Sequence, residues 1–264
     1  MSRIGESFAH LRVEKRDGFI PFITAGDPDM ETTRELLIEL ARAGATVIEL
    51  GVPFSDPMAD GPVIQRASER ALKHDFGIAE ILNMVAQARK ETDVPIVLFS
   101  YFNPLLNYGV ERLANDAARA GVDGVLVTDL VPEEAVEFSA ELAAHDLDII
   151  FLVAPTSTDT RLRMVAERAR GFIYAVSRAG ITGTRDSVSK DAEQLVARVR
   201  KFSTLPVAVG FGISTAEQVA ETWRYADAAV VGSALVAEIE RLSGAEDIVP
   251  RIGEFARRLL PDKH

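Results

Sequence analysis

The chain has 264 residues, 47% of them hydrophobic, which is enough for a large core and suits a single α/β barrel. It has no Cys and no run near the roughly 20 apolar residues that cross a membrane, which excludes a disulfide framework and a transmembrane helix. The net charge of −11 argues against nucleic acid and anionic membranes as partners. Residues 2–16 are predicted as a short helix, with Ile4, Phe8 and Leu11 at helical spacing. This segment has no apolar signal-peptide core, so we expect a cytoplasmic protein.

Apolar runs and helical patterns alternate along the rest of the chain. Strands are predicted at residues 18–25, 46–51, 94–100, 123–128, 148–153, 172–177, 206–210 and 228–232. Helices are predicted at about residues 30–43, 63–73, 78–91, 110–120, 133–144, 159–169, 191–202 and 215–223 and within 246–260. Because each strand is followed by a helix, the pattern predicts an α/β fold, a (β/α)8 TIM barrel. With the extra N-terminal helix, residues 1–264 are expected to form a single domain.

The segment at residues 47–62, VIELGVPFSDPMADGP, combines the end of an apolar strand with a proline-rich loop. A carboxylate in such a strand is costly unless it is paired, neutralised or used. Glu49 shares a strand face with Val47, so it is expected to face the core near the end of the strand. Asp60 follows on the stiffened loop, and the two acids indicate an acid/base pair. The residues alone leave a second interpretation open, in which Glu49 is a structural buried acid and Asp60 is a turn residue or a helix cap.

The carboxyl ends of the strands are where such barrels place their active sites. Tyr101 follows the third predicted strand, and Tyr174 lies in the sixth. Strands seven and eight lead into glycine turns at 210–214 and 232–234, whose backbone amides can approach a ligand. Loops in these two places often bind phosphate, so a phosphate site is predicted there. The long polar loop at 178–191 is either a lid over the site or a plain surface loop.

Metal and Schiff-base chemistry are not predicted. The histidines lie away from the predicted strand ends, at His10, His74, His145 and His264. The lysines lie outside the predicted strands, at Lys15, Lys73, Lys90, Lys190, Lys201 and Lys263. Acid/base catalysis by carboxylates, with a tyrosine nearby, is the remaining chemistry.

Five motifs together resemble the tryptophan synthase α subunit family over nearly the whole chain. They are PFITAGDP at 21–28, ELGVPFSDPMADGP at 49–62, YAVSRAGITG at 174–183, GFGIS at 210–214 and VGSA at 231–234. The resemblance implies a TIM barrel that cleaves indole-3-glycerol phosphate into indole and glyceraldehyde 3-phosphate, a retro-aldol reaction. It also implies that this chain has no cofactor and docks on a β subunit that carries pyridoxal phosphate, in an α2β2 heterotetramer. Indole would pass to the β subunit through a tunnel.

The same resemblance implies roles for individual residues. Glu49 would be the general acid/base, Asp60 would stabilise positive charge on the indole nitrogen, and Tyr174 would lie close to the reacting groups. The positions lining the indole pocket are Phe22, Phe99, Tyr101 and Leu152. Phe99 is larger than the leucine expected at its position. The phosphate positions are Gly183, Phe211, Gly212, Gly232 and Ser233. Thr182 would orient Asp60 when the loop closes.

The partner surface is expected on the same face as the site. Its residues are Pro53, Phe54, Asp56 and 102–109. Leu105, Leu106 and Tyr108 would form an apolar patch there if they are exposed, and would otherwise pack locally. Two other functions stay open: a different phosphate-binding barrel enzyme, and a non-catalytic barrel that regulates a partner. The Glu49–Asp60 segment argues against the first, and the presence of both carboxylates argues against the second.

Overall fold

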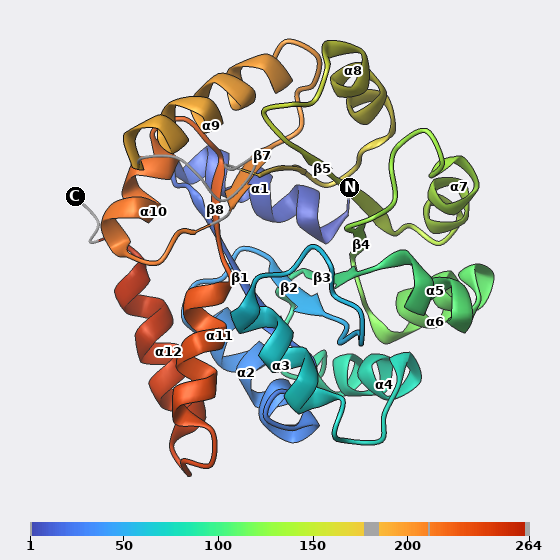
Figure 1. The fold of residues 1–264 in the computed structure, drawn as a ribbon, viewed down its shortest axis with the longest axis vertical. Coiled ribbons are helices and arrows are strands. Elements are labelled where there is room, and N and C mark those ends of the chain that lie inside the picture. Colours follow the sequence, from blue (N-terminus) through green and yellow to red (C-terminus); the bar gives the residue numbers. More distant parts are fainter. Residues whose placement is uncertain (1, 177–184, 211, 262–264) are drawn as a thin grey trace.

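Eight parallel strands close into a barrel in the computed structural model, which describes residues 2–176, 185–210 and 212–261 (Figure 1). Each strand pairs with the next along the chain, and β8 closes the barrel on β1. The strands are β1 (Gly18–Thr24), β2 (Ile48–Gly51), β3 (Ile96–Ser100), β4 (Gly124–Val127), β5 (Asp148–Val153), β6 (Ile173–Val176), β7 (Val207–Gly210) and β8 (Ala228–Val231). The predicted TIM barrel is therefore confirmed.

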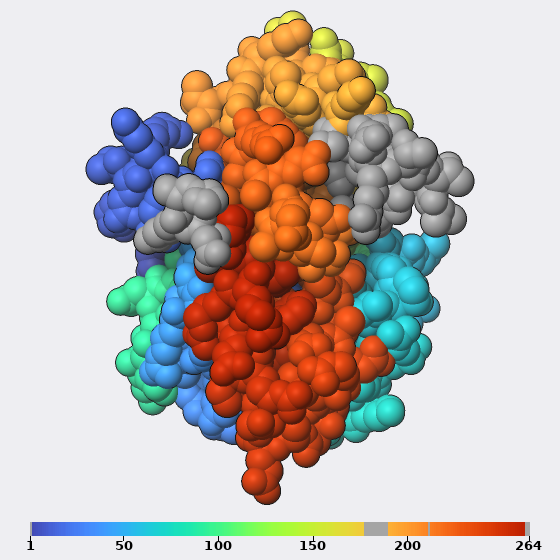
Figure 2. Space-filling model, turned by 90° about the vertical axis from the view of Figure 1, so that its left-hand side faces the viewer, coloured from blue at the N-terminus to red at the C-terminus, as the bar shows by residue number. Residues whose placement is uncertain are grey.

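Helices between consecutive strands cover the outside of the barrel (Figure 1). They are α2 (Met30–Arg42), α4 (Ile78–Ala88), α6 (Val110–Ala120), α7 (Val136–Ala144), α8 (Asp159–Arg168), α9 (Arg185–Val199) and α10 (Ala216–Trp223), with α12 (Ile248–Leu259) after β8. The additional helices are α1 (Arg3–Glu14), α3 (Pro62–Ala71), α5 (Phe102–Tyr108) and α11 (Ser233–Leu242). In Figure 2, α10, α11 and α12, coloured orange to red, cover one side of the molecule.

The strands alternate between two cores, as period-2 burial requires. Val47 and Val97 belong to the cluster inside the barrel, whereas Ile48 packs outward against the helices. Helix α1 closes one end of the barrel with Ile4 and Phe8, both of which pack on the interior cluster. Burying such a side chain stabilises the fold by about 1.5–3 kcal/mol. The carboxyl ends of the strands therefore form the accessible end of the barrel interior.

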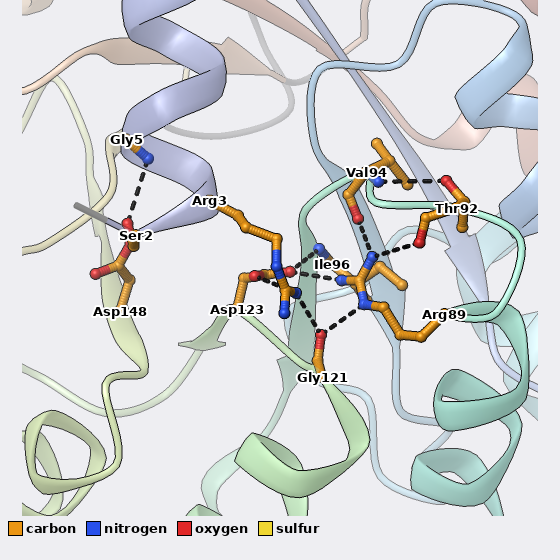
Figure 3. Close-up of polar contacts among 10 residues, drawn as sticks. All are labelled: Ser2, Arg3, Gly5, Arg89, Thr92, Val94, Ile96, Gly121, Asp123 and Asp148. Atoms are coloured by element: carbon orange, nitrogen blue, oxygen red, sulfur yellow. Dashed lines mark hydrogen bonds and ion pairs between the residues drawn. The ribbon is translucent and has the colours of Figure 1, made fainter.

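Charged groups fix α1 at the closed end (Figure 3). Asp123 accepts hydrogen bonds from Arg3 at 2.8 Å and from Arg89 at 2.6 Å, and a backbone amide of β3 donates a third bond. Ser2, the N-cap of α1, donates to Asp148. Burial nevertheless raises the pKa of Asp123, because desolvation outweighs the two arginines. These contacts are structural and lie at the end of the barrel opposite the strand carboxyl ends.

Three helical regions differ from the sequence-based predictions. Helices α5 and α11 were not predicted, and α9 begins at Arg185, so the prediction of a loop as far as residue 191 is wrong. The apolar pattern of α9 starts only at Ala192, because its first turns carry polar residues. Helix α5 is a single short element between Tyr101 and Gly109, below the length at which periodicity is reliable. Residues 177–184 lie outside the described residues, and with them half of the segment predicted as a lid.

Candidate active site

Glu49 lies inside the barrel, in the middle of the short strand β2. Its Cα is in register with Phe22 of β1 on one side and Val97 of β3 on the other. The side chain is 1% exposed, and among the described residues its Oε1 atom has no hydrogen-bond partner. Burial raises the pKa of Glu49 to about 8, because desolvation disfavours the carboxylate. Glu49 is therefore mostly a neutral acid at pH 7, and the predicted inward orientation is confirmed.

Asp60 lies on the segment between β2 and α3. Hydrogen bonds of the Asp60 backbone hold this segment in place. The Asp60 amide donates to the Pro57 carbonyl at 3.1 Å, and its carbonyl accepts from Gln65 Nε2 at 2.9 Å. The Tyr101 hydroxyl accepts from the Ala59 amide at 2.9 Å. Burial raises the pKa of the Asp60 carboxyl to about 6, and the hydrogen bond from Tyr101 offsets part of that rise. Asp60 is therefore largely ionised at pH 7, where Glu49 is largely neutral.

Asp60 lines a hollow at the carboxyl ends of β1, β2 and β3. We call it the Asp60 hollow. Its lining residues are Phe22, Thr24, Gly51, Val52, Asp60, Ile64, Ser68, Phe99, Ser100 and Tyr101. The rings of Phe22 and Phe99 meet edge to face, with centroids 5.3 Å apart. Three of the predicted indole-pocket residues, Phe22, Phe99 and Tyr101, are thus brought together beside Asp60. Aromatic rings beside one carboxylate suit a flat ring that carries an N–H group, and Thr24, Ser68 and Ser100 add hydroxyl groups to the lining.

Thr24, Ile64 and Ser68 are lining residues that the sequence analysis missed. Thr24 follows Phe22 by two residues on the same strand face, so strand alternation could have identified it. Ile64 and Ser68 are four residues apart and share one face of α3. Helical spacing could have grouped these two side chains, but it does not reveal which face of α3 lies on the strand ends.

Tyr174 and Leu152 enter the barrel interior from β6 and β5, where they are in register. Burial raises the pKa of Tyr174 well above its ordinary value, and the proximity of the Glu49 carboxylate raises it further. Gly210 leaves room for this ring, since a Cβ there would lie 2.1 Å from the Tyr174 hydroxyl. Tyr174 therefore lies near Glu49 inside the barrel.

Three of the predicted phosphate residues, Gly212, Gly232 and Ser233, lie after the ends of β7 and β8. Gly212 has a φ of 77°, which favours glycine, and a Cβ there would meet no atom within 4 Å. Gly232 is the N-cap of α11 and makes no side-chain cap bond, and Ser233 begins the helix. Amide groups in this first turn have no partner within the helix and favour an anion. Thr182, Gly183 and Phe211, the other predicted residues of the site, lie outside the described residues.

The residues of the predicted partner surface differ in how exposed they are. Leu106 is 53% exposed, whereas Leu105 is fully buried, so Leu105 packs locally and does not contribute to an apolar patch. Tyr108 is partly buried and donates its hydroxyl to Asp116. A hollow beside this surface separates the 52–53 segment from α4 and α5. Asp56, on the loop that leads to Asp60, is exposed.

The described residues contain neither a cluster of metal-ligating side chains nor a membrane-spanning helix. No group of three or more His, Asp and Glu side chains in that part of the chain is placed to hold a metal ion. No helix among the described residues is both long and apolar enough to span a membrane.

Comparisons with known proteins agree with this geometry. The family model described as tryptophan synthase alpha chain matches residues 8–260. The chain is similar to the tryptophan synthase alpha chain of Geobacter sulfurreducens, at 53% identity over 93% of each chain. It is also similar to that of Geobacter sp. (strain M21), at 51% identity over 98% of this chain and 97% of the relative.

Solved structures extend the similarity to the fold. Tryptophan synthase subunit alpha from Legionella pneumophila matches with a TM-score of 0.90 and 38% identity, covering 98% of this chain and 97% of that one. A chain from the tryptophan synthase of M. tuberculosis matches with a TM-score of 0.87 and 38% identity, covering 98% and 97%. A family model over nearly the whole length, together with relatives at about half identity, establishes the relationship. The chain belongs to the tryptophan synthase alpha chain family.

Proposed function

We propose that Glu49 and Asp60 carry out the reaction of this family, the retro-aldol cleavage of indole-3-glycerol phosphate into indole and glyceraldehyde 3-phosphate. As a member of the family, the chain is a carbon–carbon lyase. The observation that carries the residue assignment is the buried Glu49 carboxyl group, whose pKa of about 8 keeps it protonated at neutral pH. A carboxylic acid in that state can donate a proton and then take one back.

The proposed steps balance over one turnover. Glu49 gives its proton to the ring carbon that bears the side chain, which leaves a positive charge on the ring nitrogen. The Asp60 carboxylate, ionised above about pH 6, stabilises this charge. Glu49, now a carboxylate, takes the proton of the hydroxyl on the carbon attached to the ring. The bond between that carbon and the ring then breaks, which releases indole and the aldehyde, and Glu49 is again protonated.

The two ends of the substrate are assigned to different elements. We place the indole ring at the Asp60 hollow, against Phe22, Phe99 and Tyr101, with Leu152 deeper in the barrel. The hollow has a volume of about 10 Å³, which holds a single water molecule, so its lining side chains must move apart to admit the ring. The phosphate is assigned to the amides around Gly212 and to the first turn of α11 at Gly232 and Ser233. The proposal also includes three residues that lie outside the described residues: Thr182, Gly183 and Phe211. Tyr174 is assigned to the reacting groups, because it lies near Glu49.

The partner of the chain is a β subunit, as the family membership and the tryptophan synthase structures indicate. Alpha chains of this family have no cofactor, and pyridoxal phosphate belongs to the β subunit. We propose an α2β2 heterotetramer in the cytoplasm as the working form.

Glu49→Gln tests the assignment, because it keeps the size of the side chain and removes its proton chemistry. We expect indole production from indole-3-glycerol phosphate to fall by about 10²–10⁴-fold, with substrate binding retained. Glu35→Gln, an exposed acid on the outer helix α2, is the control and is expected to be fully active. Near-normal turnover of Glu49→Gln would show that another group is the acid.

A further inference from the structure

An ion network outside the proposed site begins at the end of β1. Asp27 follows this strand and is 1% exposed. Both of its carboxylate oxygens accept from Arg70 of α3, with Nε to Oδ1 and Nη2 to Oδ2 each at 2.8 Å. This two-pronged contact fixes the direction as well as the distance between the two side chains. The remaining nitrogen of the Arg70 guanidinium, Nη1, does not bind Asp27 and is free to donate to another residue.

Arg70 of α3 also forms an ion pair with α11. Arg70 Nη1 donates to Glu240 Oε1 at 2.8 Å, across 170 residues of sequence. Glu240 also accepts from Arg66, one turn earlier on α3, at 2.8 and 2.7 Å. We call Asp27, Arg66, Arg70 and Glu240 the Asp27–Glu240 network. It carries two negative and two positive charges, and it connects three elements that contact one another.

The connected elements carry opposite ends of the proposed substrate site. Helix α3 starts two residues after Asp60, and its face with Ile64 and Ser68 lines the Asp60 hollow. Helix α11 starts at Ser233, at the proposed phosphate position. Figure 1 shows these two additional helices close together at β1. Neither belongs to the regular strand–helix pattern, and Ala67 of α3 and Val236 of α11 pack on Phe22 of β1. This apolar packing is non-directional, so the ion network adds a directed contact to it.

Stability alone is a weak explanation for such a network. Exposed ion pairs contribute little, and buried pairs often stabilise no more than well-packed apolar side chains would. What a bidentate buried pair does supply is a defined geometry. The network is therefore suited to fix where α3 and α11 lie relative to β1.

We propose that Asp27, Arg70 and Glu240 are positioning residues that set the distance between the Asp60 segment and the phosphate-binding end of α11. With the phosphate held by α11, this distance decides where the indole ring meets Glu49 and Asp60. The inference rests on the proposed function, since it assigns the two ends of the substrate to these helices. A displacement of about 1 Å in such an arrangement can cost about 10²-fold in rate.

Asp27→Asn and Glu240→Gln test the proposal, with Glu238→Gln as the matched control. Glu238 lies on the same helix and pairs with Arg241, three residues away, so its loss removes an ion pair without releasing α3. For each variant, kcat and KM for indole-3-glycerol phosphate are measured, together with the Kd of glycerol 3-phosphate, which carries the phosphate but no ring. Thermal unfolding establishes that each variant is folded at the assay temperature.

Both network variants are expected to lower kcat/KM by about 10–100-fold, through a lower kcat as well as weaker glycerol 3-phosphate binding. Glu238→Gln should stay within about two-fold of the unchanged protein, because its pair with Arg241 lies within a single helix and does not contact α3. Asp27→Asn removes the buried charge that pairs with Arg70 and can prevent folding. In that case Glu240→Gln provides the test, because Glu240 is partly exposed.

Normal kcat, KM and glycerol 3-phosphate affinity in a folded network variant would overturn the proposal, even if its unfolding temperature fell. An inactive Glu49→Gln beside fully active network variants would overturn the positioning role alone. Retained turnover in Glu49→Gln would instead overturn the proposed function of the site.

Discussion

The Glu49 carboxyl group links the site to the stability of the fold. Its pKa lies near 4.5 in an unfolded chain and rises to about 8 in the folded protein, because burial disfavours the charge. Between these values the folded state holds a proton that the unfolded state has lost. The contribution of Glu49 to stability is therefore fully present below about pH 4.5 and falls as the pH rises towards 8.

Glu49→Gln should remove this dependence on pH. The shift in pKa sets an upper bound of about 4–5 kcal/mol, and we expect roughly 2–4 kcal/mol. Urea unfolding at pH 5 and pH 9 would measure the effect. The free energy of unfolding of the unchanged protein should decrease between the two pH values by more than that of Glu49→Gln, by the stated amount. Equal decreases in the two proteins would mean that Glu49 is not held neutral by burial.

The two carboxyl groups also predict how activity depends on pH. Asp60 must be ionised, and burial raises its pKa to about 6, so kcat/KM should rise as the pH passes that value. Glu49 must carry its proton at the start, so kcat/KM should fall as the pH passes about 8. Initial rates of indole formation from pH 5 to 9.5 should give a bell. A flat profile across this range would contradict the assigned protonation states.

At the scale of elements, the strands could be predicted and some helices could not. Strand β2 shows why: Val47 and Glu49 face the barrel interior while Ile48 faces the helices, as alternation along a strand dictates. Most of the apolar runs have a glycine or proline at one end, and each of the eight predicted strands overlaps a strand of the barrel. Alternation does not say which residues of neighbouring strands lie in register, and the pairing of Glu49 with Phe22 and Val97 is visible only in the structure.

Helices α3 and α11 carry the parts of the site that local patterns leave undetermined. Helix α11 has its buried residues, including Leu235 and Ile239, at helical spacing, but it follows directly on the glycine turn after β8. The face of α3 that lines the Asp60 hollow depends on how this helix lies against β1. The Asp27–Glu240 network is a further example, since its members are far apart in sequence and each would pass as an ordinary surface charge.

For the whole molecule, a net charge of −11 makes an anionic substrate dependent on local donors. The first turn of α11 supplies backbone amides rather than side-chain charges, and its effect extends only over short distances. The same charge would oppose an acidic partner surface, so apolar contacts must provide much of the affinity for the β subunit. Met58 and Leu106 are the exposed apolar side chains nearest in sequence to the Asp60 segment and to β3, respectively.

Leu106→Asp should therefore weaken docking of the β subunit. Leu106 is 53% exposed on α5, which follows the carboxyl end of β3, so a partner can bury it. A partner can bury only the exposed half of Leu106, so losing that burial costs about 0.8–1.5 kcal/mol, or roughly 4–13-fold in Kd. Val13→Asp is the matched control, because Val13 is 83% exposed on α1, which closes the opposite end of the barrel. Calorimetric titration with the β subunit measures both affinities, and the cleavage rate of each isolated variant shows whether its own site is intact. Equal affinities for the two variants would place the β subunit elsewhere on the chain.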